Sequence, residues 1–183
     1  MPRLWLPDAV KVRGRDAGEM TKDNGDCKVT IHTEGVDRGR KGRDGNAVSL
    51  ANYVAAKNIG YHFVYDRAGR FAQLYKPTEG SRALLAGAWS PNRQGKINIQ
   101  ICFAGIADAH DINDWPLKNW DHFLKFVQAW GVPDRPICNF ERPQRSERDW
   151  KRSGWTCHAA APCGNDHVDG KGAPIHRLLQ SGR

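Results

Sequence analysis

Apolar and polar residues alternate over Lys28–Thr33, and this pattern predicts a β-strand. Val29 and Ile31 fall on one face of that strand, whereas His32 falls on the other. The segment Ile97–Phe103 shows the same alternation and predicts a second strand. Each strand should pack its apolar face against a core, so the side chain of His32 should point away from the apolar side.

Other segments predict a hairpin and several helices. Two short runs rich in aromatic residues, Tyr61–Tyr65 and Phe71–Tyr75, are joined by the turn-forming residues 66–70, which is typical of a β-hairpin. Elsewhere the apolar positions recur with the helical period of 3.6 residues. Helices are expected over Ala47–Lys57, over Pro116–Trp130 with Asp114 as N-cap and Gly131 at the end, from a capping Ser146, and from Pro174.

These elements predict an α/β fold in which a mixed central β-sheet is flanked by helices. A chain of 183 residues is long enough to bury one core, so we expect a single domain over 1–183, with residues 1–27 as an irregular lead-in. No apolar run approaches the length of a membrane span, and the first residues lack the apolar core of a signal peptide. We therefore expect a protein made in the cytoplasm, without stable membrane association.

The net charge indicates the class of partner, and the cysteine count bears on disulfide bonding. The formal net charge of +8 favours a polyanionic partner, such as a nucleic acid, an anionic membrane or an acidic cell-wall polymer. Five cysteines, an odd number, argue against a disulfide scaffold in a chain without a secretion signal. Cys102 lies in a strand pattern and is expected to be buried. Cys157 and Cys163 are close enough in sequence to form a disulfide after release from the cell.

Residues 157–170 concentrate the side chains that bind borderline-soft divalent metals. Two kinds of metal site are consistent with them. A structural site would use Cys157, His158, Cys163 and His167, which would close the coordination shell. A catalytic site would use three ligands, some of them distant in sequence, and would keep one position for water. The spacing of the local cluster matches no common zinc finger.

The order of three features along the chain resembles a known family. His32 and Glu34 end the first strand, Tyr61 opens the hairpin, and His158 and Asp169 follow late in the sequence. This set resembles the type 2 N-acetylmuramoyl-L-alanine amidases, which are zinc hydrolases that include many phage lysins and share their fold with peptidoglycan recognition proteins. The resemblance covers residues 20–180, and the lead-in is most similar to lysins of phages that infect actinobacteria.

The resemblance implies that Zn²⁺ is held by His32, His158 and Asp169. Two histidines and one carboxylate would leave a fourth tetrahedral position for water. In the family the last ligand usually precedes Pro-Gly, whereas here Asp169 precedes glycine and lysine. Asp166 and His167 therefore stay open as alternatives to Asp169.

The resemblance also implies catalytic residues. Tyr61 matches the active-site tyrosine of the family, and His167 matches a residue that stabilises the oxyanion two positions before the last ligand. Some members carry a glutamate where this chain has Gln100, and an amide cannot act as a base. If a carboxylate is required, Glu34 is the nearest candidate in sequence. The loop expected over the site offers three residues for binding substrate: Trp89, Asn92 and Arg93.

The implied function is hydrolysis of the amide bond between N-acetylmuramic acid and L-alanine in bacterial peptidoglycan, by a monomeric phage endolysin without a separate cell-wall-binding domain. The endolysin would be made in the host cytoplasm and would act on the wall after release. Two alternatives stay open: a non-catalytic peptidoglycan-binding module of the same fold, and a zinc-containing nucleic-acid-binding protein. Against the second, no expected helix carries a continuous basic stripe, so we expect no nucleic-acid partner.

Overall fold

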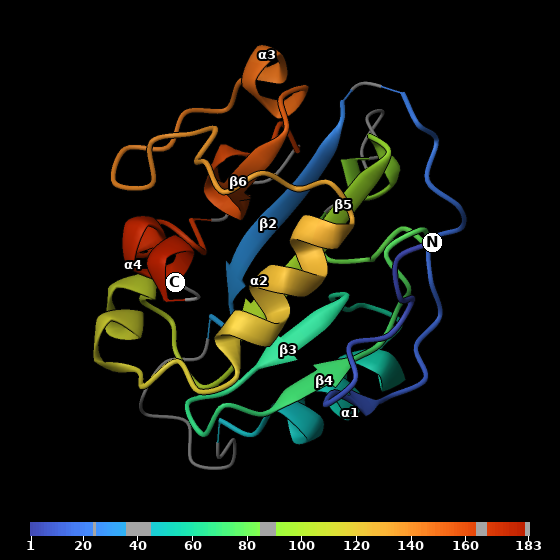
Figure 1. Ribbon diagram of the computed structural model, residues 1–183, viewed down its shortest axis with the longest axis vertical. Coiled ribbons are helices and arrows are strands. Elements are labelled where there is room, and N and C mark those ends of the chain that lie inside the picture. The colour runs from blue at the N-terminus through green and yellow to red at the C-terminus, as the bar shows by residue number, and fades with distance from the viewer. Residues whose placement is uncertain (24, 36–44, 85–90, 164–167, 182–183) are drawn as a thin grey trace.

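The computed structural model describes residues 1–23, 25–35, 45–84, 91–163 and 168–181. Within these ranges, six strands form one sheet in the order β1-β4-β3-β5-β2-β6 (Figure 1). Strands β3 and β4 pair antiparallel, and all other neighbours pair parallel, so the expected mixed α/β sheet flanked by helices is confirmed. The strands are β1 (Val10–Lys11), β2 (Cys27–Thr33), β3 (Phe63–Tyr65), β4 (Phe71–Gln73), β5 (Ile97–Phe103) and β6 (Gly154–Cys157).

One face of the sheet carries the larger hydrophobic core. Val29 and Ile31 of β2 are fully buried there, as the alternation predicts. They share a cluster with side chains of β5, of α2 (Trp120–Ala129) and of α4 (Ile175–Gln180). In Figure 1, α2 runs across this face of the sheet. Burial of this apolar face fixes which residues of β2 point towards the opposite side.

Helix α1 (Ala47–Ala56) packs on the opposite face, against β3 and β4. The side chain of Asn46 caps it by accepting hydrogen bonds from the backbone N–H groups of Val48 and Ser49. The hairpin holds the same helix end, because Asp66 Oδ2 accepts from the first backbone N–H of α1 at 3.0 Å. The predicted helix is confirmed, and Lys57 serves as its C-cap.

The polar side chains of β2 and β5 lie on the α1 side of the sheet but are also buried. Thr30 Oγ1 donates to Asn98 Oδ1 at 3.2 Å, and Asn98 Nδ2 donates to the carbonyl oxygen of Pro91 at 2.7 Å. The second bond ties the short 3₁₀-helix Pro91–Arg93 to the sheet. We call these buried side chains of β2 and β5 the polar layer: Lys28, Thr30, His32, Asn98 and Gln100. His32 lies at the end of this layer on β2 and is fully buried.

The start of α2 differs from the prediction. Residues Ala109–Asp114 form a separate 3₁₀-helix, and α2 begins only at Trp120, after Asn119. Asp114 is therefore not its N-cap. The physical reason is backbone conformation: Leu117 and Asn119 take positive φ values of 50° and 60°, which interrupt a right-handed helix. The predicted end is correct, since the chain leaves the helix at Trp130 and Gly131.

The remaining elements are short. The expected irregular lead-in contributes β1, and Leu6 N–H donates to Gln73 Oε1 at 2.8 Å, so this segment is joined to β4. The predicted short helices are present as α3 (Glu147–Trp150), capped by Ser146, and as α4 after Pro174. Among the described helices, none has the length and apolar character needed to cross a lipid bilayer.

Lys28 is an unusual member of the buried polar layer. Its side chain is fully buried at the start of β2, and Nζ lies 5.0 Å from the ring centre of Trp150. Within the described part of the chain, Nζ has no hydrogen-bond partner. Burial lowers the pKa of Lys28 to about 8, because a charged ammonium group is poorly solvated there.

We predict that Lys28 makes stability rise with pH. Between the lowered pKa of about 8 and the ordinary value near 10.5, the unfolded chain binds the proton that the folded chain has released. The free energy of unfolding should therefore increase by up to about 3 kcal/mol across this range. Buried acids with raised pKa values, such as the Cys102 thiol and the Tyr61 phenol, oppose this rise. Urea titrations at pH 7.5 and pH 10 are therefore compared between the parent protein and Lys28→Met, and the change in unfolding free energy with pH should be more positive in the parent protein. The exposed Lys96 supplies the control, since Lys96→Met should leave the pH dependence unchanged.

Candidate metal centre

His32 reaches the candidate site because β2 ends there. It is the sixth residue of β2, its ring is fully buried, and it lies on the face opposite the α2 core. The neighbouring strand β6 runs parallel to β2, with Ile31 opposite Cys157. His158 follows Cys157 directly, at the start of the 3₁₀-helix His158–Ala160. The two imidazole rings are thereby brought to a centroid distance of 4.8 Å.

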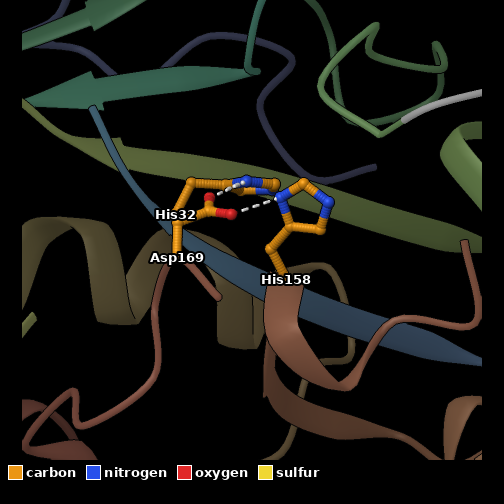
Figure 2. A group of neighbouring side chains, drawn as sticks. All are labelled: His32, His158 and Asp169. Carbon is orange, nitrogen blue, oxygen red and sulfur yellow. Dashed lines mark hydrogen bonds and ion pairs between the residues drawn. The ribbon is translucent and has the colours of Figure 1, made fainter. Parts of the chain in front are cut away.

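Asp169 lies between the two histidines (Figure 2). Its Oδ2 is 2.9 Å from His32 Nδ1, and its Oδ1 is 2.7 Å from His158 Nδ1. The ligand atoms of the three residues all lie within 4.8 Å of one another. Two imidazole nitrogens and a carboxylate oxygen are donors that suit a divalent transition metal. The residues that the sequence nominated for a three-ligand site therefore form one group that could bind a metal ion.

Mutual hydrogen bonding dominates the electrostatics of this group. Burial raises the pKa of Asp169, but hydrogen bonds from His158 and His32 outweigh that effect and hold it well below its ordinary value. For His158, burial lowers the pKa, and hydrogen bonds with Asp169 and Cys163 more than compensate, so the net shift is upward. Asp169 is thus ionised at neutral pH and available as an anionic ligand.

Gly170 explains why the chain departs from the Pro-Gly expected after the last ligand. Its φ of +77° lies in the left-handed region, which the ring of proline cannot adopt. A Cβ at this position would also collide with the carbonyl oxygen of Ile31 and lie 3.0 Å from Cys157 Cβ. The backbone beside Asp169 therefore packs directly on the ends of β2 and β6, and only glycine fits there.

Gln100 holds the other side of the His32 ring. His32 Nε2 and Gln100 Oε1 are 2.6 Å apart, so Nε2–H donates to the amide oxygen and Nδ1 faces Asp169. The backbone of Gln100 is fixed in turn by His62, whose Nδ1 accepts from Gln100 N–H at 3.1 Å. His62 Nε2–H donates to the carbonyl oxygen of Glu79, and burial lowers the pKa of His62 to about 4. His62 is thus a neutral structural histidine.

Sequence reasoning considered Gln100 only as a missing base and did not anticipate its contact with His32. The signal was present in the alternation of β2 and β5, because Gln100 and His32 occupy the same face of two strands that pair directly. Thr30 is the partner of Gln100 in that register, and His32 lies one step further along the same face.

Tyr61 lies beside the group of His32, His158 and Asp169, and its predicted catalytic role stays a prediction. Its ring centre is 5.0 Å from that of His32, and it packs partly against the smaller core beneath α1. Burial, with contributions from Cys102 and Asp169, raises the pKa of Tyr61 well above its ordinary value. The phenol therefore keeps its proton at neutral pH and can act as a hydrogen-bond donor.

The other predicted site residues are placed differently. Glu34 Oε2 accepts from the backbone N–H of Gly105 at 2.7 Å, and Glu34 is not part of the metal-binding group. Asn92 is 4% exposed, and its amide is bound to both backbone groups of Leu84. Arg93 Nε donates to the carbonyl oxygen of Glu19 at 2.8 Å. Their roles stay predictions; Trp89, Asp166 and His167 lie outside the described residues.

The local cysteine–histidine site considered from the sequence has a different geometry. Cys157 Sγ lies 3.9 Å from Cys138 Sγ, on the opposite side of the sheet from His32. Cys163 packs in a small cluster with Leu84 and Trp150. Within the described residues, the group with converging ligand atoms consists of the two histidines and Asp169, without sulfur.

The sequence matches no protein-family model and no curated protein. The fold, however, matches solved structures. PlyL aligns with a TM-score of 0.57 at 14% identity, over 96% of this chain and 98% of PlyL. The Staphylococcus aureus hydrolase AmiA aligns at 0.54 and 13%, over 96% and 83%. A mutant endolysin from Bacillus subtilis aligns at 0.51 and 14%, over 100% and 99%. The fold expected from the resemblance is confirmed.

We predict that Gln100 positions His32 for metal binding. Removal of its acceptor in Gln100→Met should weaken divalent-metal affinity by about 10–100-fold, the usual effect of losing an outer partner of a ligating histidine. Gln100→Glu keeps an oxygen opposite Nε2–H and should retain the affinity. Competition with a chromogenic chelator measures both. Equal affinities for Gln100→Met and the parent protein would show that this contact does not orient the ligand.

Proposed function

We propose that this chain is a zinc-dependent N-acetylmuramoyl-L-alanine amidase. The bond cleaved would be the amide between the lactyl group of N-acetylmuramic acid and L-alanine in bacterial peptidoglycan. The observation that carries the proposal is the convergence of His32, His158 and Asp169 at the carboxyl ends of β2 and β6. This convergence occurs within a fold shared with an endolysin and a hydrolase, and the resemblance in the sequence points to the same chemistry.

The donor set fits zinc. Two neutral imidazoles and one carboxylate are a common ligand set of catalytic zinc sites, and they leave one position open. The Nδ1 atoms of both histidines face the same carboxylate, so the donors already point towards a shared centre. A zinc ion held there would supply Lewis acidity towards the scissile carbonyl and would lower the pKa of water towards ~7.

The residues around this centre have distinct tasks in the proposed reaction. Gln100 accepts from His32 Nε2–H and so fixes the ring with Nδ1 facing Asp169, where both groups would hold the metal. Tyr61 stays protonated and would donate its O–H to the oxygen on which negative charge develops. His167 would be a second donor, by its position two residues before Asp169.

The biological setting that we propose is that of a phage endolysin. Such a protein would be made in the host cytoplasm and would reach the wall after release. The net charge of +8 supports this setting, because anionic wall polymers attract a basic protein over a distance of about one Debye length.

A non-catalytic peptidoglycan-binding module is the second candidate, and Gln100 favours it, because an amide replaces the carboxylate that some relatives use. Digestion of purified peptidoglycan separates the two candidates. An amidase should release new N-terminal amines on L-alanine without new reducing ends. Binding to peptidoglycan without new amines, by zinc-loaded protein, would overturn the enzymatic proposal.

We predict one zinc ion per chain, lost together with activity in His32→Ala. The reason is that His32 supplies one of only three protein ligands in the group. Elemental analysis of the dialysed protein measures the zinc. Cys163→Ser, which keeps a hydrogen-bonding group beside His158, is the control and should keep both zinc and activity. If His32→Ala kept stoichiometric zinc while Cys163→Ser lost it, the metal would belong to a local cysteine–histidine site.

Tyr61 and His167 should act on the transition state rather than on zinc retention. Loss of one donor to a developing oxyanion typically costs on the order of 100-fold in rate. For Tyr61→Phe and His167→Ala we therefore expect kcat and kcat/KM to fall together by about that factor. Steady-state kinetics, with zinc content and thermal midpoint measured in parallel, test this. Loss of zinc in His167→Ala would make His167 a ligand in place of Asp169.

A further inference from the structure

Two cysteines that the proposed reaction does not use lie next to each other. The Sγ atoms of Cys138 and Cys157 are 3.9 Å apart. Thr156 Oγ1 also donates to Cys138 Sγ at 3.5 Å. The sequence suggested a different pair, Cys157 with Cys163, because they are close along the chain. Folding brings Cys157 to a cysteine nineteen positions earlier.

The backbone around this pair has the geometry of adjacent parallel strands. Trp155 N–H donates to the carbonyl oxygen of Arg135, and Ile137 N–H donates to that of Trp155, both at 2.8 Å. Pro136 and Trp155 are bridge partners, and continuing this register by two residues would place Cys138 opposite Cys157. Neighbouring strands are separated by about 4.8 Å, within the Cα separations of about 4.4–6.8 Å that disulfides span. Together with the Sγ–Sγ distance of 3.9 Å, this spacing places the pair within reach of a disulfide.

The two thiols differ in access and in acidity. Cys157 is fully buried, whereas Cys138 is partly exposed and lines a cavity of about 820 Å³. Charged residues of both signs line the same cavity, Arg152 and Arg177 together with Glu141 and Asp149. A hydrogen bond with Cys157 lowers the pKa of the Cys138 thiol, against the opposing effect of burial, and the same contact together with burial raises the pKa of Cys157. A reagent in solution therefore meets Cys138 first, and Cys138 is the more acidic of the two thiols.

We propose that Cys138 and Cys157 form a thiol–disulfide exchange site for small disulfides of the glutathione type. In the first step the Cys138 thiolate attacks one sulfur of the disulfide, and the other sulfur leaves as a thiolate. In the second step the sulfur of Cys157 attacks Cys138 Sγ, its proton passes to solvent, and the second small thiolate leaves. The protein dithiol is oxidised by two electrons, and the small disulfide is reduced to two thiols.

This site is structurally connected to the metal centre. Cys157 is bonded to His158 through the backbone, and Gly170, the neighbour of Asp169, packs against Cys157 Cβ. A disulfide would link residues 135–138 to β6, the strand that leads directly into His158. Because it closes a loop of about twenty residues, we expect oxidation to raise the thermal midpoint by about 5–10 °C.

The test is incubation of the purified protein with oxidised glutathione at pH 7.5, followed by thiol counting and non-reducing peptide mapping. We expect two of the five thiols to be lost, with the peptide containing Cys138 linked to the one containing Cys157. Cys157→Ser should stop at a mixed disulfide of glutathione with Cys138. Cys138→Ser should form neither product, and Cys163→Ser, the matched control, should oxidise like the parent protein.

Several outcomes would overturn the proposal. One is a Cys157–Cys163 linkage in the parent protein, and another is a free Cys138 thiol after prolonged incubation. A third is protection of the pair by added zinc, which would make the thiols metal ligands. Thermal midpoints of the reduced serine variants close to that of the reduced parent establish that a lost product reflects a lost thiol and not a lost fold.

Discussion

The structure depends on the parallel pairing of β2 with a strand on each side. Because β5 and β6 both run parallel to β2, the carboxyl ends of these strands meet at one edge of the sheet. His32 lies near the end of β2, and His158 follows the last residue of β6. Two histidines separated by more than one hundred residues are thus brought together by backbone hydrogen bonding. Asp169 joins the two histidines at the same edge of the sheet.

The hydrophobic core protects this arrangement, although it contributes no ligand. Val29 and Ile31 are locked into the core beneath α2, so a slip of β2 by one residue would place His32 in that core. Such a slip would leave an imidazole without partners in the apolar core and would put apolar side chains among the buried polar groups of the other face, and both changes are unfavourable. The register that buries the apolar face is therefore the register that aims His32 at Asp169. The polar contacts Thr30–Asn98 and His32–Gln100 add to the same preference on the other face.

The sequence predicted features that follow from local pattern, and it missed features that depend on long-range contacts. Alternation located β2 and β5, and the order of motifs nominated the three residues of the metal-binding group. The start of α2 was wrong because two residues with positive φ precede it, and periodicity does not detect them. Strand β1 has only two residues and exists through pairing with β4. The contact of Cys138 with Cys157 also arises from strand register, in a segment whose sequence shows no strand pattern.

Gly170 has a consequence for how the site can change over time. Side chains that bind a metal are usually regarded as the residues that evolution cannot replace, whereas glycines in loops are regarded as permissive. Here the neighbour of Asp169 is confined by the carbonyl oxygen of Ile31 and by Cys157, so a side chain of any other amino acid collides there. A position with no functional group is thus closed to substitution by packing alone. The sequence that specifies this site therefore includes a glycine, a residue that has no side chain.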